Sequence, residues 1–214
     1  MATNENQPKV KKAQESKKSS GGRSPQPAYE LFVLGELMNG PQHGYKLHAI
    51  IQRILGPFHR LSWGTLYPLI RRLETQHLIT SESEQDGEEG AERGERGQQR
   101  KHYRLTEAGQ ERFFALMADP GDYNADYPDL FAIKLSKFNL VSPEQQLAVL
   151  QHYYDYLRVL RDHYGHGRSQ IMANPGINDE ERPFVLQLSD YHMSYLDARL
   201  AWLETKIASL TIGQ

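Results

Sequence analysis

Apolar residues recur every three or four positions in three successive segments of the N-terminal third. This spacing gathers apolar side chains on one face of an α-helix, so it predicts amphipathic helices over Pro27–Asn39, Gly44–Leu55 and Ser62–His77. A Gly-Pro pair follows each of the first two segments and is expected to end the helix. Ser62 is a favourable N-cap for the third helix, in which Pro68 predicts a local distortion.

Two short strand-like runs follow, at residues 78–83 and 100–105, and they predict a β-hairpin with a long connection. Thr106 is expected to cap a further helix that ends near Met117. Three helices followed by a hairpin, with the third helix basic, match the element order of a winged helix-turn-helix domain.

The remainder of the chain predicts only helices. The sequence Asp119-Pro120-Gly121-Asp122 is expected to break the chain and to mark a domain boundary. Helices are then predicted over residues 128–139, 143–164 and 180–210. Ser142 and Gln145 fit a capping box at the start of the second of these helices, and Gly165 is expected to end it.

The last predicted helix carries large apolar side chains at alternating three- and four-residue spacing, which is typical of a coiled-coil seam. We expect this seam to hold two copies of the chain together. It consists of Leu188, Tyr191, Tyr195, Ala198 and Trp202.

The predicted fold class is therefore mainly α with a small β-hairpin. A disordered basic tail is expected over residues 1–27, a winged helix-turn-helix domain over 28–118 and a helical dimerisation domain over 119–214. The chain has no Cys, which excludes disulfides and thiolate metal sites. It also has no apolar run of the roughly 20 residues that a membrane span needs, so we expect a cytoplasmic protein without membrane contact.

The net charge of −2 hides an uneven distribution of charge along the chain. Residues 1–27 and 43–78 each carry a net charge of +4, whereas residues 80–99 carry −5 and are rich in glycine. The basic tail could keep the protein in solution or could track the phosphates of a nucleic acid. The acidic glycine-rich stretch predicts a flexible loop at the tip of the wing.

The third helix presents polar and compact residues opposite its core stripe of Leu66, Ile70 and Leu73. Such a face could simply be solvated, or it could enter a DNA groove, where arginines meet phosphates and guanine edges. The candidate DNA-binding residues, which include one residue of the second helix and two of the wing, are Ser62, Gly64, Thr65, Tyr67, Pro68, Arg71, Arg72, Lys46, Arg100 and Lys101.

Four separated motifs add a resemblance to a known family. The segment LSWGTLYPLIRRLE at residues 61–74 resembles the third-helix signature of the PadR family of transcriptional regulators, as do Gly44-Tyr45, RKHYRLT at residues 100–106, and Gly109. The resemblance implies a winged helix-turn-helix protein that binds operator DNA as a homodimer. The C-terminal part looks like the longer dimerisation domain of the subfamily that contains phenolic-acid-responsive repressors. The long acidic wing loop and the extra N-terminal tail depart from the family pattern.

The C-terminal half is rich in aromatic residues, which could fill a dimer core or line a pocket for a planar ligand. The candidate ligand residues are Tyr153, Tyr154, Tyr191, Tyr195 and Trp202. A metal site built from His152, His163 and His166 is less favoured than solvated histidines, and no cofactor is expected.

The sequence contains none of the phosphate-binding, nucleophile-elbow or zinc-protease motifs that indicate enzymes, so we expect no catalytic activity. The favoured function is a dimeric DNA-binding transcriptional regulator, acting as a repressor that a small aromatic effector releases from double-stranded DNA. The alternative is a helical-dimer interaction module whose basic winged domain binds an acidic protein partner.

Overall fold

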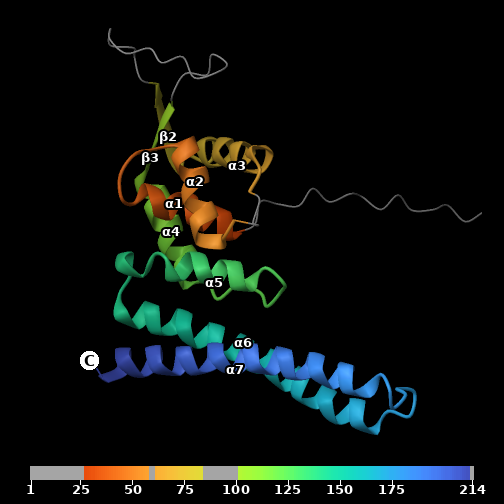
Figure 1. Ribbon diagram of the computed structural model, residues 1–214. Helices are drawn as coiled ribbons and strands as arrows, with labels where there is room; N and C mark the ends of the chain where they lie inside the picture. Colours follow the sequence, from red (N-terminus) through yellow and green to blue (C-terminus); the bar gives the residue numbers. More distant parts are fainter. Residues whose placement is uncertain (1–26, 58–60, 84–100, 213–214) are drawn as a thin grey trace, which may run out of the picture.

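The computed structural model describes residues 27–57, 61–83 and 101–212 (Figure 1). The predictions for the basic tail, for the acidic wing loop and for Arg100 lie outside the described residues. The fold class is confirmed, because the chain is mainly helical and contains one three-stranded antiparallel sheet.

The three N-terminal helices are confirmed with ends within two residues of the prediction: α1 (Pro27–Leu37), α2 (Gly44–Leu55) and α3 (Trp63–Thr75). α3 continues through Pro68. The prediction was wrong for His77, which lies beyond the helix in the left-handed region at φ 57° and therefore turns the chain into the first wing strand. The apolar faces form a common core that includes Leu31, Leu34, Leu47, Ile51, Leu66, Leu69, Ile70 and Leu73.

The predicted hairpin is confirmed as β2 (Ile79–Ser83) and β3 (Lys101–Leu105), which pair antiparallel with Ile79 opposite Leu105. Sequence reasoning missed the two-residue strand β1 (Gln42–His43), which adds to the other edge of β3. Two residues between helices carry no periodicity, so only the pairing with β3 defines this strand.

The junction between the wing and α4 (Glu107–Ala118) is held by Thr106. Its hydroxyl donates to the main-chain oxygens of His77 (2.8 Å) and Leu78 (2.9 Å), and it accepts from the Gly109 amide (3.1 Å), as the predicted N-cap requires. Gly109 packs directly on this strand end, because a Cβ atom there would lie 2.0 Å from the Leu78 oxygen.

The C-terminal part consists of α5 (Tyr127–Leu135), the 3-10 turn η1 (Phe138–Leu140), and the 31-residue helices α6 (Pro143–Ala173) and α7 (Arg182–Ile212). The capping box of Ser142 and Gln145 is confirmed. The prediction that this helix ends at Gly165 was wrong, because α6 continues through Gly165 and Gly167.

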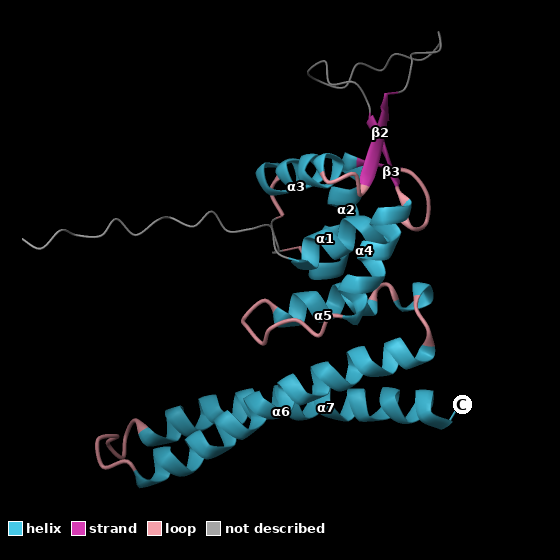
Figure 2. Cartoon of the chain, turned by 180° about the vertical axis from the view of Figure 1, so that it is seen from behind, coloured by secondary structure: helices cyan, strands magenta, loops and turns pink. Residues whose placement is uncertain are grey.

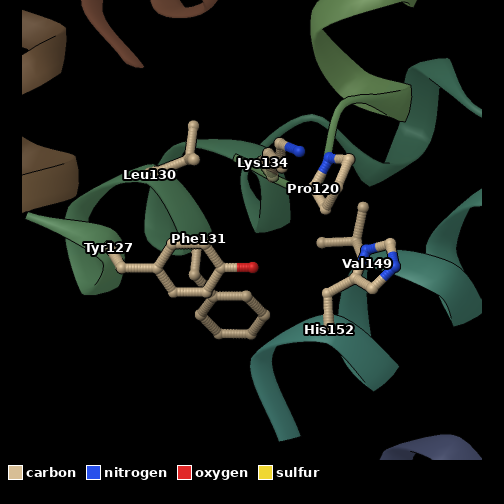
Figure 3. A pocket seen from close by; sticks show the side chains of 7 residues that line it. All are labelled: Pro120, Tyr127, Leu130, Phe131, Lys134, Val149 and His152. Atoms are coloured by element: carbon tan, nitrogen blue, oxygen red, sulfur yellow. The ribbon is translucent and has the colours of Figure 1, made fainter. Parts of the chain in front are cut away.

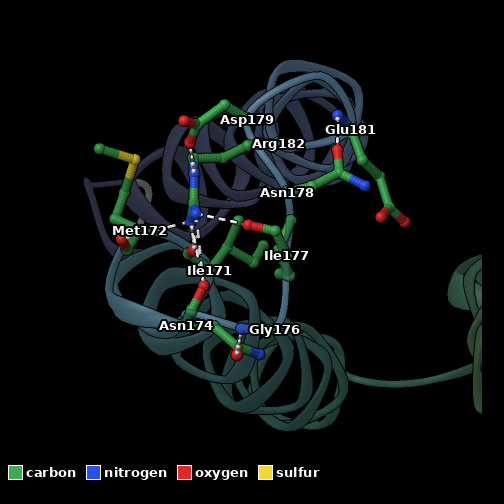
Figure 4. Close-up of polar contacts among 9 residues, drawn as sticks. All are labelled: Ile171, Met172, Asn174, Gly176, Ile177, Asn178, Asp179, Glu181 and Arg182. Atoms are coloured by element: carbon green, nitrogen blue, oxygen red, sulfur yellow. Dashed lines mark hydrogen bonds and ion pairs between the residues drawn. The ribbon is translucent and has the colours of Figure 1, made fainter.

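α6 and α7 form an antiparallel hairpin whose turn is organised by Arg182 (Figure 4). The Arg182 guanidinium donates to the main-chain oxygens of Ile171 (2.5 Å), Asn174 (3.3 Å) and Ile177 (2.5 Å). These oxygens belong to the last turn of α6, to its C-cap and to the connecting turn, so Arg182 ties the end of α6 to the turn. Along the hairpin, ion pairs join Arg161 to Asp197 (2.6 Å) and Arg168 to Asp190.

α5 connects the winged part to the hairpin. Ile133 is fully buried in the N-terminal core, while Phe131 belongs to the core that α5 forms with α6 and α7. Lys134 donates to the main-chain oxygens of Met117 and Asp119, and Lys137 pairs with Glu36 of α1 inside the protein. The predicted boundary near Asp119 therefore separates two segments of chain that remain packed together through α5.

The molecule is elongated, with the winged part at one end and the α6–α7 hairpin at the other (Figures 1 and 2). α3 and the β2–β3 hairpin lie at the end farthest from α6 and α7. The surface of α3 is thus left clear of the C-terminal helices.

Candidate nucleic-acid interface

α3 has one buried face and one exposed face. Leu66, Leu69, Ile70 and Leu73 point into the core. The opposite face is exposed and consists of Ser62, Gly64, Thr65, Pro68, Arg71 and Thr75. All six are small, polar or basic, so a groove of DNA could approach this face closely.

Arg71 is the basic residue of this exposed face. It forms no ion pair with another described residue. Burial raises the pKa of the Tyr103 hydroxyl of β3, and the positive charge of Arg71 opposes that rise. Arg71 is therefore an exposed cation of α3 whose guanidinium makes no ion pair with the described residues.

Arg72 differs from its neighbour. Its Nη2 donates to the Glu30 carboxylate of α1 at 2.7 Å, and Arg112 Nε of α4 donates to the other Glu30 oxygen at 2.7 Å. Glu30 is only 6% exposed, so this network ties α1, α3 and α4 together. Arg72 was predicted to bind DNA, but in the structure its guanidinium is bonded to Glu30 inside the domain.

Three further predicted DNA-binding residues lie on α3, α2 and β3, and Arg104, which was not predicted to bind DNA, lies on the wing as well. Tyr67 is half-buried and its ring stacks on Trp63, with centroids 5.2 Å apart. Lys46 of α2 and Lys101 of β3 are exposed. The wing residue Arg104 pairs with Glu82 on the neighbouring strand at 3.6 Å.

Sequence reasoning missed two exposed aromatic residues of this end. Trp63 is 39% exposed at the start of α3 and stacks on His48, with centroids 4.3 Å apart. Tyr45 is 60% exposed at the start of α2 and stacks on His43. Both residues lie within the motifs that resemble the PadR family. Each is a large aromatic residue outside the apolar stripe of its helix, and this signal could have identified them.

The predicted seam lies on the face of α7 that does not contact α6. Leu188, Tyr191, Tyr195 and Trp202 are 41–66% exposed, and Ala198 is exposed too. Leu196, Leu200 and Leu203 instead fill the core with α6. A row of large apolar side chains is thus available along α7 in the single chain.

The five candidate ligand residues do not line one pocket. Tyr153 is buried on Phe131, with ring centroids 3.7 Å apart, and burial raises the pKa of its hydroxyl to about 12. Tyr154 donates to Glu204 at 3.1 Å. Tyr191, Tyr195 and Trp202 belong to the exposed face of α7, whereas Tyr153 lies in the core between α5, α6 and α7.

A small hollow lies beside α5 and α6 (Figure 3). It has a volume of only about 10 Å³ and is lined by Tyr127, Phe131, Lys134 and His152, among others. Burial lowers the pKa of Lys134 to about 8, although the nearby Asp119 carboxylate opposes this shift. The hollow is smaller than the roughly 300–1,000 Å³ of typical small-molecule pockets.

The described residues contain neither a cluster of metal ligands nor a helix able to cross a membrane. They hold no group of three or more side chains placed to bind a metal ion, and His152, His163 and His166 form no such group. In the same part of the chain, no helix combines the length and the apolar character that crossing a membrane requires.

Comparison with known proteins points to one family. Residues 33–115 match the model of the "Transcriptional regulator PadR-like family". An uncharacterized 37.1 kDa protein in transposon TN4556 of Streptomyces fradiae is 37% identical over 82 residues, which cover 38% of this chain and 20% of that protein. The chain thus spans about a fifth of the length of this relative.

Two solved structures of Bacillus subtilis PadR are also similar. The complex with operator DNA has 17% sequence identity and a TM-score of 0.38, covering 85% of this chain and 98% of that one. The complex with p-coumaric acid has 16% identity and a TM-score of 0.36, covering 86% and 99%.

Proposed function

Because residues 33–115 match the model of the PadR-like family of transcriptional regulators, we propose that this chain is a homodimeric repressor that binds operator DNA through α3. The exposed face of α3 carries the proposal. That face is compact and basic, it lies at the end of the molecule away from the C-terminal helices, and its opposite side is fixed in the core.

In this proposal, the α3 residues have different roles. Arg71 contacts a base edge or a phosphate, while Ser62 and Thr65 at the start of the helix donate to phosphates, where the helix dipole also favours anions. Gly64 and Pro68 allow the backbone to approach the groove. Arg72 acts as a positioning residue, because its bond to Glu30 fixes the orientation of α3 against α1.

Lys46 and Lys101 would extend the phosphate contacts to α2 and to the wing. Both side chains are exposed, Lys46 on the first turn of α2 and Lys101 at the start of β3. Residues that contact phosphates fix the position of a protein on the duplex but do not read sequence. We assign sequence reading to Arg71 and Tyr67, and positioning on the duplex to the two lysines.

Dimerisation is proposed through the exposed seam of α7. A symmetric DNA-binding dimer presents two recognition helices to half-sites about one helical turn apart. The seam residues provide the apolar surface for such a contact, and they are exposed in the single chain despite their size.

Release by a small aromatic effector is the remaining part of the proposal. An effector can release DNA only if it prefers a conformation whose two recognition helices are wrongly spaced. Lys134 and Lys137 provide the mechanical link, because they fasten α5 to α1 and α4. A shift of the α6–α7 hairpin would therefore move the winged part with it.

A footprint of the protein on the DNA upstream of its own gene tests the proposal. We expect protection of two half-sites about one helical turn apart, and an affinity that falls steeply with salt because bound counterions are released. The alternative function, an interaction module for an acidic protein, predicts no protected duplex at any salt concentration. That result would contradict the proposal.

A further inference from the structure

A groove of about 460 Å³ lies between α6 and α7 near their connecting turn. It is far from α3 along the molecule (Figure 1) and separate from the small hollow beside α5. Its volume falls within the range of pockets that hold small molecules, roughly 300–1,000 Å³.

The absence of a side chain at Gly167 helps to open this groove. A glycine inside a helix costs roughly 1 kcal/mol relative to alanine, yet α6 continues through both Gly165 and Gly167. A Cβ atom at either glycine would meet nothing within 4 Å. Gly167 lines the groove and Gly165 does not, so only Gly167 contributes to its space.

The walls of the groove suit a flat apolar molecule. Tyr164 of α6 and His192 of α7 stack nearly parallel, with centroids 4.3 Å apart and an interplanar angle of 11°. Ile171, Val185 and Leu188 add aliphatic surface. A ring placed here would contact aromatic and aliphatic groups from both helices.

Two polar groups of the lining have unused hydrogen-bonding capacity. Ser189 is 6% exposed, and its hydroxyl has no hydrogen-bond partner among the residues that the structure describes. A buried hydroxyl without a partner is costly, and a ligand group could supply the missing bond. His166 Nδ1 lies 2.6 Å from the Asp162 main-chain oxygen, which can only accept, so the neutral ring keeps Nε2 as an acceptor.

We propose that this groove binds a small planar aromatic molecule that carries a hydroxyl or N–H group. The ring lies against Tyr164, Ile171 and Val185, and the polar group bonds to the Ser189 hydroxyl, with His166 as a second acceptor. Binding at this site does not depend on whether the chain binds DNA. Leu188 belongs to both the groove and the seam. A second copy of the chain that packs on the seam would therefore compete with the small molecule for this surface.

The test titrates the full chain with 2-naphthol, a fluorescent planar aromatic alcohol, while sedimentation reports the oligomeric state. Gly167→Leu places a side chain in the groove, and Gly165→Leu is the matched control on the same helix. We expect the wild type and Gly165→Leu to bind alike and Gly167→Leu to bind at least tenfold more weakly. Ser189→Ala should weaken binding about fivefold, as the loss of one hydrogen bond predicts.

Equal binding by Gly167→Leu and Gly165→Leu would overturn the proposal, as would no binding by the wild type. A wild-type dimer that does not bind 2-naphthol and that Gly167→Leu dissociates would also overturn it. In that case the groove is part of the contact between two copies of the chain. Circular dichroism of both leucine variants ensures that lost binding does not reflect lost helix.

Discussion

At the scale of single residues, the winged part depends on contacts between segments far apart in the sequence. Glu30 accepts from Arg72 and Arg112, and Thr106 joins the end of α3 to the wing. The sequence predicted that α3 would expose a basic face but could not separate Arg71 from Arg72. The partner that engages Arg72 lies 42 residues away, and helical spacing carries no information about it.

Gly109 offers the sharpest test at this scale. A Cβ atom there would lie 2.0 Å from the Leu78 oxygen and 2.7 Å from Leu105 Cδ1. We expect Gly109→Ala to lower the free energy of unfolding by about 1–3 kcal/mol, because α4 must move away from the wing. Gly165→Ala, which meets nothing, should instead raise it by up to about 1 kcal/mol. Urea unfolding measures both, and equal stability of the two variants would show that the contact is not tight.

At the scale of elements, periodicity predicted α2 and α3 well, because each buries a single apolar face. α1 was also predicted, although it is buried on nearly all sides. The error at α6 has a physical cause. Glycine commonly ends a helix. Here α6 packs along its length against α7, and the ion pair between Arg168 and Asp190 lies beyond Gly165, so the helix continues through the glycine. The docking of α5 was also not predictable, because it depends on two lysines that are buried only in the folded chain.

The pH dependence of stability tests the buried position of Lys134. Burial lowers its pKa to about 8 from an ordinary value of 10.5. Between these values the unfolded chain binds more protons than the folded chain, so the lysine makes the free energy of unfolding rise with pH in this window. Lys134→Met should remove that contribution, and Lys206→Met, at an exposed position of α7, should keep it.

Denaturant titrations at the two ends of that pH window measure the difference. If the stability of Lys134→Met rises with pH as steeply as that of the wild type, the amine is not held in the buried position next to the end of α4.

At the scale of the whole molecule, the elongated shape separates two surfaces. α3 and the wing form one end, and the exposed seam of α7 lies on the hairpin at the other (Figure 2). The sequence predicted both surfaces from helical spacing. α3 has a polar face opposite its apolar stripe, and α7 has a row of large apolar residues with the spacing of a coiled-coil seam. The sequence could not show that the five proposed ligand residues separate into the buried Tyr153, the half-exposed Tyr154 and the seam, since that depends on which face of α7 meets α6.

The seam makes a direct prediction about assembly. Tyr191→Asp combined with Ala198→Asp places two charges on the exposed face of α7. We expect a folded monomer, because neither residue contributes to the core with α6 and charges are costly in an apolar interface. Val159→Asp, at a 57% exposed position of α6, is the control and should remain a dimer. Sedimentation velocity decides, and a dimeric double variant would place the contact elsewhere.

The central claim is that the exposed face of α3 binds DNA, and one measurement addresses it most directly. Arg71→Ala and Arg158→Ala each remove one exposed arginine, the first on α3 and the second on α6. We measure their affinities for operator and for scrambled duplex at two salt concentrations, with melting temperature as a check on folding.

We predict that Arg158→Ala binds as the wild type does, whereas Arg71→Ala melts normally but loses roughly 1–3 kcal/mol of operator binding. If Arg71 contacts a base, the loss is confined to the operator. If it contacts a phosphate, binding to both duplexes weakens and the salt dependence falls by about one counterion. Wild-type affinity of Arg71→Ala for both duplexes would contradict the claim that α3 binds DNA.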